Sequence, residues 1–398
     1  MRILYFYQYF STPNGSWGTR AYENARHWVA LGNDVTIITS VFYKSDLQVK
    51  KGRLTYEMNC EGIKVKVVNV LSSNKQSILQ RIKGYFFYIA AAIKYAVSYP
   101  CDIVIVSSGP LSVGIPGLIA KYLRRKKMVF EVRDLWPEGA IQLGVISNKI
   151  VIRFLYWLEK QCYAASSLIV VLSPGMISYI RQKVPSANII SIPNASDIEM
   201  FSHPQPLELP DWTIGKFIIL YTGNIGETNN SRLLLKSSKL LKQKGISHIL
   251  FVLIGDGQLK EELILQKNNE QIDNLVILDL MPKNKLVAWV QRANVCIIPL
   301  ADKPFIDTSS PNKLFEAFAA GKCVIQTTNG WIKEILQTTA AGFSVSPCDE
   351  VELVRCVEML HDNPAILRAA GEASRKLAEN FEKSKLAELM INAINKII

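Results

Sequence analysis

The chain of 398 residues is 49% hydrophobic and 20% charged, and its 46 Lys and Arg against 34 Asp and Glu give a formal net charge of +12. A chain this long and this apolar forms two or three domains with large cores, which excludes disordered, collagen-like and coiled-coil proteins. The positive charge belongs to one half, because residues 1–190 hold 24 Lys and Arg against 10 Asp and Glu.

Apolar runs and helical patterns alternate along the first half of the chain. Strands are predicted at 2–7, 35–39, 103–106, 128–132, 168–172 and 189–192, and helices at 19–31, 75–98, 111–125, 148–164 and 175–184. Continuous apolar runs between helices are typical of a parallel sheet that is covered on both faces. The segment 52–70 differs, because its two short alternating strands around Glu61 and Gly62 predict a hairpin at the sheet edge.

The second half repeats this rhythm after a proline-rich segment, residues 202–216, which predicts a linker. Strands are predicted at 217–222, 249–254, 275–278, 295–299, 324–326 and 343–345, followed by consecutive helices. We therefore predict an α/β fold with two doubly wound, Rossmann-like domains, 1–201 and 217–380, which face each other across a cleft. A C-terminal helix within 381–398 is expected to return to the first domain.

The seven cysteines are scattered without a C-x-x-C pair, which indicates reduced thiols in a cytosolic protein rather than disulfides or a zinc site. The four histidines show no ligand spacing and no D-x-D pair is present, so no metal is expected. The first residues do not match a signal peptide, and no stretch approaches the ~18 apolar residues that span a bilayer. These features predict a cytoplasmic protein whose contact with a membrane is peripheral.

Three loops that follow predicted strands contain glycines. They hold Gly15 and Gly18, then Gly223, Asn224 and Gly226, and finally Gly257. Ligands of open α/β sheets bind beyond the carboxyl ends of the strands, and glycines let the backbone approach a phosphate. Each loop alone is equally compatible with a tight structural turn. Together they favour a nucleotide-sized ligand, and the absence of G-x-G-x-x-G argues against a nicotinamide cofactor.

The segment TSSPNKLFEAFAAG, residues 308–321, is the most informative. Ser310 is predicted to cap a short helix that begins with Pro311 and ends at Gly321. The helix dipole disfavours a cation in the first turn unless an anion is present, so Lys313 suggests a bound anion there. Glu316, one turn later, is placed to accept hydrogen bonds from sugar hydroxyls. The alternative is a surface helix with a solvated Lys and Glu.

Four charged residues cluster after the predicted strand 128–132. Glu131, Arg133, Asp134 and Glu138 are costly to bury unless they are paired. One interpretation is a structural ion pair of Arg133 with Asp134 or Glu138. The other is an acceptor-side site, in which a carboxylate acts on the hydroxyl of an acceptor.

The helix 75–98 is apolar on more than one side. A stripe suited to a core comprises Ile78, Ile82, Tyr85, Phe86, Ile89, Ile93 and Ala96. On the opposite side, aromatic and basic residues predict a surface that binds an anionic membrane, namely Arg81, Phe87, Tyr88 and Lys94. The basic run after residue 120, with Arg124 and Arg125, is expected to reinforce this surface. The alternative is that these aromatic residues pack beneath the hairpin 52–70.

These motifs, taken in order, resemble the retaining glycosyltransferases of family 4, in the bacterial branch that builds O-antigen, capsule and exopolysaccharide. The resemblance covers essentially the whole chain and is carried by ILYFYQYFSTPNGSWGTRAYENARHWVALGNDVTIITS, VFEVRDLWPEGAIQLG, SIPNASDIEMF, YTGNIG and SSPNKLFEAFAAGKCVI. It implies the GT-B fold. The segment 133–137 is most similar to the N-acetyl-L-fucosamine transferases of O-antigen synthesis.

The resemblance also implies roles for single residues. Glu316 would bind the ribose of a nucleotide-sugar donor, and Gly15 would lie against its diphosphate. Asp134 would lie on the acceptor side. The start of the helix would face the diphosphate through Ser310, Asn312, Lys313 and Leu314.

The chain departs from the family pattern at two places. Thr308 stands where the family usually has the first Glu of Glu-x7-Glu. Residues 227–230 replace the usual Arg and Lys after the glycine loop, and Arg232 is the nearest cation. Lys313 is expected to take over the neutralisation of the diphosphate.

The implied activity is a retaining, metal-independent transfer of a sugar, with N-acetyl-L-fucosamine as the candidate, from a UDP-sugar to a polyprenyl-diphosphate-linked saccharide. Such an enzyme needs no cofactor and works at the inner face of the cytoplasmic membrane. One alternative is a non-catalytic nucleotide-sugar-binding partner of another transferase, which Thr308 makes conceivable. A nucleic-acid-binding protein is disfavoured, because no signature of such a domain accompanies the basic half.

Overall fold

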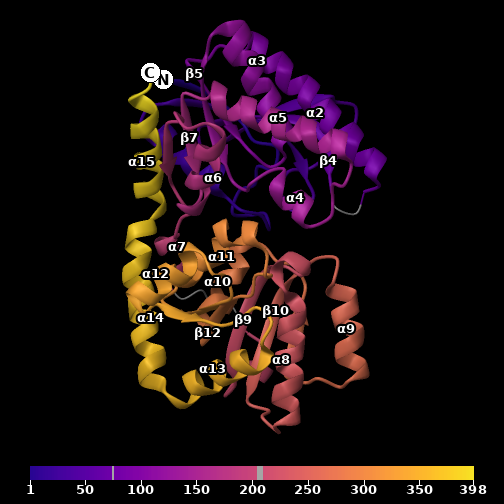
Figure 1. The fold of residues 1–398 in the computed structure, drawn as a ribbon, viewed down its shortest axis with the longest axis vertical. Coiled ribbons are helices and arrows are strands. Elements are labelled where there is room, and N and C mark those ends of the chain that lie inside the picture. Colours follow the sequence, from indigo (N-terminus) through magenta and orange to yellow (C-terminus); the bar gives the residue numbers. More distant parts are fainter. Residues whose placement is uncertain (74–75, 204–208) are drawn as a thin grey trace. The chain divides into compact units, whose positions relative to one another are not determined.

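The computed structural model describes residues 1–73, 76–203 and 209–398, and its contacts divide the chain into two compact units (Figure 1). Unit 1 comprises Met1–Pro193 and Lys383–Ile398, and unit 2 comprises Asn194–Glu382. The boundary thus precedes the predicted one at residue 201. The reason is that Asn194 donates a hydrogen bond of 2.6 Å to the carbonyl of Ser310 in unit 2. Residues 204–208 of the predicted linker lie outside the described part.

Unit 1 is built on one eight-stranded sheet in the order β3-β4-β2-β1-β5-β6-β7-β8. Its pairs are parallel except for the antiparallel edge hairpin β3–β4, so this hairpin prediction is confirmed. The strands are β1 (Arg2–Phe6), β2 (Asp34–Phe42), β3 (Thr55–Cys60), β4 (Ile63–Ser72), β5 (Ile103–Ser107), β6 (Lys127–Val132), β7 (Leu168–Val171) and β8 (Ile189–Ser191).

Helices cover both faces of this sheet. One face, which includes Leu4 and Phe6 of β1, packs against α2, α3, α5 and α6. On the other face Tyr5 contacts Trp28 of α1, and the indole N–H of Trp28 donates to the carbonyl of Ala387 in α15. The helices are α1 (Arg20–Ala30), α2 (Ile78–Ser98), α3 (Gly114–Arg124), α4 (Glu138–Gln142), α5 (Lys149–Ala165), α6 (Gly175–Lys183) and α15 (Lys383–Asn395), with a 3₁₀ turn at Leu111–Val113.

Unit 2 has a six-stranded parallel sheet in the order β11-β10-β9-β12-β13-β14. Two clusters of buried apolar side chains lie on its two faces, as expected for a doubly wound sheet. Its strands are β9 (Phe217–Asn224), β10 (Ile249–Asp256), β11 (Leu275–Leu278), β12 (Val295–Ile298), β13 (Cys323–Gln326) and β14 (Gly342–Ser344).

The helices of unit 2 follow the predicted alternation, and its last two are consecutive. They are α7 (Ile198–Ser202), α8 (Ser231–Gln243), α9 (Lys260–Asn269), α10 (Lys283–Arg292), α11 (Asn312–Ala319), α12 (Trp331–Thr339), α13 (Glu350–Asp362) and α14 (Pro364–Ala378). Short 3₁₀ turns lie at Asp211–Thr213, Glu227–Asn229, Pro304–Thr308 and Glu379–Phe381.

The predicted core stripe of α2 is wrong in part. Ile82 and Phe86 are exposed, whereas Tyr88, which was expected at the surface, is fully buried and donates a hydrogen bond to the carbonyl of Ile38. The packing face of the helix follows small residues and Tyr88, namely Gly84, Tyr88, Ala92 and Ala96. These small residues let the helix lie close to the sheet. The side chain of Ile78 lies outside what the structure describes.

The outward-facing residues of the predicted membrane surface divide into two groups. Phe87, Arg81, Lys94 and Arg125 are exposed. Arg124 is instead half-buried and donates to the carbonyl of Tyr99 at the end of α2, over 2.6 Å. It therefore joins α3 to α2. Within the described ranges, none of the helices combines the length and hydropathy that crossing a bilayer requires.

Candidate active site

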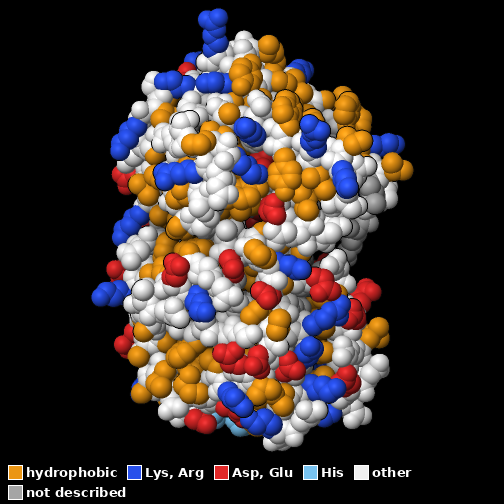
Figure 2. Space-filling model, in the orientation of Figure 1, with side chains coloured by type: hydrophobic (Ala, Val, Ile, Leu, Met, Phe, Trp, Pro, Cys, Tyr) orange, Lys and Arg blue, Asp and Glu red, His pale blue; other side chains and the backbone are white. Residues whose placement is uncertain are grey.

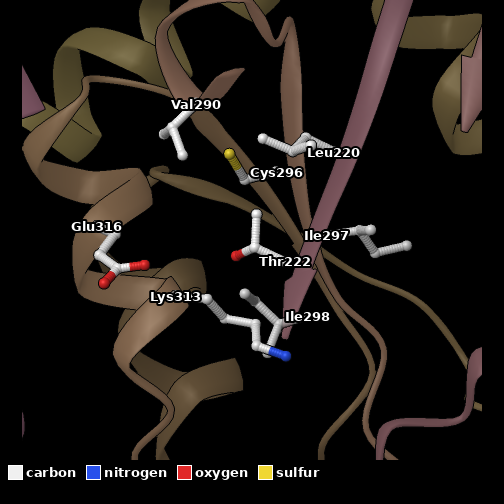
Figure 3. A pocket seen from close by; sticks show the side chains of 8 residues that line it. All are labelled: Leu220, Thr222, Val290, Cys296, Ile297, Ile298, Lys313 and Glu316. Carbon is white, nitrogen blue, oxygen red and sulfur yellow. The ribbon is translucent and has the colours of Figure 1, made fainter. Parts of the chain in front are cut away.

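A narrow hollow lies in unit 2 between α11 and the strands β9 and β12. Figure 3 shows Lys313 and Glu316 projecting from α11 toward Thr222 and Ile298 of the sheet. The remaining lining is mostly apolar and comprises Leu220, Val290, Cys296 and Ile297. The two residues that the sequence selects on α11 therefore line one hollow.

Lys313 lies at the glycine segment 223–226, which begins at the end of β9 and continues into the next loop. Its Nζ is 4.0 Å from the centroid of the Tyr221 ring and donates to Oδ1 of Asn229 over 3.2 Å. Gly223 has a φ of +134°, and a Cβ at this position would lie 3.0 Å from the same Nζ. A side chain at residue 223 would thus crowd the ammonium group. Lys313 therefore lies against the glycine segment 223–226, a proximity that the sequence did not predict.

The start of α11 differs from the prediction. The helix begins at Asn312 with Pro311 in the capping position, so Ser310 is not the cap. The hydroxyl of Ser310 instead accepts a hydrogen bond from the backbone N–H of Asn194, over 3.2 Å. The side chain of Leu314 is buried in the core, so only the backbone of this residue is available to a ligand. Gly321, with a φ of +63°, follows the helix as predicted.

Sequence reasoning missed the partner of Glu316. Lys283, at the start of α10, places its Nζ 3.5 Å from Oε1 of Glu316, and both side chains are largely buried. A buried carboxylate is stabilised by a neighbouring cation. Lys283 is the first residue of its helix, where the dipole disfavours a cation unless an anion is near. Lys283 at the start of α10 therefore resembles Lys313 at the start of α11, and the anion near Lys283 is Glu316.

The glycines at and just beyond the ends of β9 and β10 have a structural explanation. Gly255 lies opposite Gly223 in the parallel pair, and a Cβ there would lie 1.8 Å from the Gly223 carbonyl oxygen. At Gly257 a Cβ would lie 2.2 Å from the carbonyl oxygen of Ile225. The two loops touch through their backbones, so Gly257 is required whether or not a ligand binds.

Contacts with neighbouring residues also hold the remainder of the segment 223–226. The carbonyl of Asn224 accepts a hydrogen bond from the Tyr221 hydroxyl, and the N–H of Gly226 donates to the hydroxyl of Ser231. A Cβ at Gly226 would lie 2.7 Å from Nδ2 of Asn224. The loop conformation is therefore defined before any ligand arrives.

The positions that depart from the family pattern make local contacts. Arg232 pairs with Glu227 over 2.9 Å and also with Glu262 at the surface. The hydroxyl of Thr308 donates to the carbonyl of Phe305 over 2.7 Å and closes a 3₁₀ turn.

A buried polar network of several residues lies in unit 1 and was not predicted from the sequence. Glu131, on β6, accepts hydrogen bonds from Arg20 Nε at 2.7 Å, Ser107 Oγ at 2.6 Å and the Tyr5 hydroxyl at 2.9 Å. Burial opposes ionisation of Glu131, but the charges of Arg20 and Arg133 outweigh it and hold the pKa of this carboxyl below its ordinary value. Glu131 is therefore an ionised structural residue.

Arg20 extends this network to the end of unit 1. Its Nη2 donates to the carbonyl of Ile192 over 2.9 Å, and Nη1 donates to the carbonyl of Pro193. Arg20 is the first residue of α1, so the rule applied to Lys313 would have indicated an anion here as well. In this case the anion is Glu131 of the protein itself.

The predicted pairing of Arg133 with Asp134 or Glu138 is absent from the described residues. Glu138 accepts hydrogen bonds from Gln142 and the Tyr156 hydroxyl, both over 2.7 Å, and these bonds lower its pKa. The guanidinium of Arg133 lies 4.9 Å from the centroid of the Tyr7 ring, and its Nη1 is buried without a hydrogen-bond partner. Asp134 is exposed.

The loop 11–19 is also shaped by contacts within unit 1. Asp46 accepts hydrogen bonds from the backbone N–H and the hydroxyl of Thr12. A Cβ at Gly15 would lie 2.1 Å from the Ser11 hydroxyl, which gives this glycine a structural role. Gly18 is half-buried just before α1. Within the described ranges, no group of three or more His, Cys, Asp or Glu is placed to hold a metal ion.

Comparisons with known proteins bear on both units. Residues 15–195 match the family model described as "Glycosyl transferase 4-like domain", and residues 216–363 match that described as "Glycosyl transferases group 1". A curated relative, the "Putative colanic acid biosynthesis glycosyl transferase WcaI" of Escherichia coli K12, is 25% identical over 54% of this chain and 53% of its own length. The chain spans about half the length of the curated relatives it matches.

Solved structures share the fold over the whole chain. Sucrose-phosphate synthase of Thermosynechococcus elongatus aligns with a TM-score of 0.76 at 16% identity, covering 100% of this chain and 98% of the other. HepE of Anabaena, solved in complex with UDP and glucose, aligns with a TM-score of 0.70 at 14% identity and covers 99% of both chains. The chain combines a glycosyl transferase 4-like domain with a following domain of glycosyl transferases group 1, and it shares the fold of these solved structures. It therefore belongs to the GT-B glycosyltransferases.

Proposed function

We propose that the protein transfers a sugar, with retention of configuration and without a metal, from a UDP-sugar to a polyprenyl-diphosphate-linked saccharide in surface-polysaccharide synthesis. The observation that carries the donor assignment is the hollow lined by Lys313 and Glu316, with the Gly223 loop against the lysine. Structures of HepE with UDP support a uridine nucleotide, and the name of WcaI supports a polysaccharide product. N-acetyl-L-fucosamine is the sugar suggested by the segment 133–137.

The chemistry follows from the charge that develops on the leaving group. As the bond between the sugar and the diphosphate breaks, negative charge builds on the phosphate oxygens. Lys313 and the backbone N–H groups at the start of α11 would stabilise this charge. In a retaining reaction the acceptor attacks from the face of the leaving group, and the departing phosphate oxygen takes the proton of the acceptor hydroxyl. No nucleophile from the protein is required.

The experiment that tests this proposal combines binding and product analysis. Thermal shifts with UDP, GDP and ADP identify the base, and the best nucleotide sugar is then incubated with a polyprenyl-diphosphate saccharide. Formation of a longer, lipid-linked product supports the proposal. Nucleotide binding without transfer to any acceptor would favour the alternative, a non-catalytic binding partner.

Glu316 provides a test of how the donor ribose is bound. We expect Glu316→Ala to weaken UDP binding by about 10- to 100-fold, because a hydrogen bond to a charged group contributes roughly 1.5–3 kcal/mol. Calorimetry with UDP and 2′-deoxy-UDP checks the cause, since the substitution should reduce the preference for UDP. A preference that persists in the variant would contradict the ribose assignment. Lys283→Gln, which removes the partner of Glu316, should have a smaller effect in the same direction.

Asp134 provides a test of the acceptor side. We expect Asp134→Asn to lower kcat by about 10- to 100-fold while UDP affinity stays unchanged, because Asp134 is proposed to orient the acceptor hydroxyl through a charge-assisted hydrogen bond of roughly 1.5–3 kcal/mol while the phosphate oxygen takes the proton. Glu138→Gln is the matched control, because Glu138 is already hydrogen-bonded to Gln142 and Tyr156. Equal kcat values for Asp134→Asn and the wild type would exclude a catalytic role for this carboxylate.

A further inference from the structure

The helices α2, α3 and α5 of unit 1 lie on the same face of the sheet, with α3 packed against both others. Figure 2 shows hydrophobic and basic side chains intermixed over these helices. The outward side of α5 carries three apolar residues at the spacing i, i+4 and i+7: Ile150, Phe154 and Trp157 are 81%, 52% and 53% exposed. This spacing places them in one row along the helix.

Other exposed apolar side chains lie on the neighbouring elements. Leu143 and Val145, between α4 and α5, are exposed, as are Tyr122 and Leu123 at the end of α3. On α2 the exposed apolar side chains are Leu79, Ile82, Phe86 and Phe87. Many large apolar side chains exposed on one face of a protein mark an interaction site rather than an ordinary solvated surface.

The charges on these three helices are nearly all of one sign. Together α2, α3 and α5 contain eight Lys and Arg and one acidic residue, Glu159, whose side chain is fully buried. Within α5, Lys149, Arg153 and Lys160 flank the apolar row and are exposed. The surface therefore presents apolar and cationic groups without an exposed carboxylate on the helices themselves.

We propose that this surface, the outward sides of α2 and α5 with the end of α3, docks on an anionic phospholipid membrane, with Phe154 and Trp157 inserted at the level of the headgroups. Aromatic side chains combine an apolar body with a polar or polarisable edge and are favoured at this depth, while Lys and Arg bind the anionic headgroups. The inference deepens the proposed function, because it names the surface through which a membrane-borne acceptor is reached. It extends the site to α5, which the sequence did not indicate.

A second copy of the chain is a less suitable occupant for electrostatic reasons. In a two-fold dimer the same surface meets itself, so Lys149 and Arg153 would face cations of the other copy. Like charges brought together across an interface oppose association. An anionic bilayer compensates the same cations.

The test is sedimentation of the full-length protein with vesicles of phosphatidylcholine, with or without phosphatidylglycerol. We expect binding to the mixed vesicles, weakened by salt, and a loss of about tenfold or more in Lys149→Glu/Arg153→Glu, since each basic residue at such a surface contributes roughly fivefold. Phe154→Ser/Trp157→Ser should show a comparable loss. The matched control is Lys236→Glu/Leu265→Ser, which alters an exposed cation and an exposed apolar residue of unit 2 and should bind like the wild type.

A fluorescence measurement reports on insertion directly. Lipids that carry a nitroxide on the acyl chain should quench the tryptophan fluorescence of the wild type more than that of Trp157→Phe. Equal vesicle binding by wild type and both α5 variants would overturn the proposal, as would a dimer in solution that these variants dissociate. Binding of UDP is measured on every variant, so loss of vesicle binding with intact UDP binding supports the surface even if no sugar transfer is found.

Discussion

Lys313→Ala is expected to weaken UDP binding by about 10- to 100-fold, the effect of removing a charge-assisted contact of roughly 1.5–3 kcal/mol. The ammonium group lies 4.0 Å from the Tyr221 ring, at the loop where Gly223 leaves room for it. Since it is proposed to act on the diphosphate, the loss should be large for UDP and small for uridine. Titration calorimetry with both ligands measures this difference.

The control for this substitution is Lys333→Ala. Lys333 also lies in the first turn of a helix of unit 2, α12, but outside the hollow beside α11. Its removal should leave UDP affinity within about twofold of the wild type, as for a surface substitution away from the ligand. If Lys313→Ala binds UDP as the wild type does, the donor assignment is wrong. An equal loss for UDP and uridine would indicate a distorted pocket rather than a lost charge contact.

Breaking the buried ion pair of unit 1 is expected to have the largest effect on stability. The side chains of Arg20 and Glu131 are 4% and 0% exposed and lie 2.7 Å apart. Glu131→Ala leaves the guanidinium buried without its carboxylate, and such a change costs about 3–5 kcal/mol in the free energy of unfolding. Hydrogen exchange of β1 and β6 in increasing urea measures this free energy for unit 1 alone.

The exposed pair Arg2–Asp102 is the control, with side chains 54% and 37% exposed. Asp102→Ala should cost less than about 1 kcal/mol, because water screens the charges of a surface pair. The buried pair also predicts a direction with pH. Folding lowers the pKa of Glu131, so the ionised carboxylate stabilises the folded state in full at a pH above the ordinary carboxyl pKa. This stabilisation is lost as the pH falls through the pKa that Glu131 has in the folded state. Equal costs at both pairs would contradict the structural role of Glu131.

Much of the fold was predictable because its signals are local. The apolar strand runs and the helices between them were located from periodicity, and the hairpin β3–β4 was recognised by its alternation. Lys313 was selected because a cation in the first turn of a short helix is unusual, and Glu316 because it lies one turn later on the same helix. These features depend only on neighbours within a few residues.

The errors have physical causes that a linear pattern does not contain. In α2 apolar residues lie on every side, so the predicted core stripe included large residues such as Phe86. The helix instead packs on the sheet through Gly84, Ala92 and Ala96. Ser310 has the side chain of a good cap, but its hydroxyl bonds the N–H of Asn194 instead. In both cases tertiary packing overrides a local preference.

The sequence by itself determined two doubly wound sheets, the helix that carries Lys313 and Glu316, and a basic first half. Only the tertiary structure decided that Glu131 pairs with Arg20, that Lys283 supports Glu316, and that an apolar and cationic surface extends over α5. Local patterns follow from the period of a helix or strand. The partners of a buried charge, and the side of a helix left uncovered, depend on elements that meet only when the sheets form.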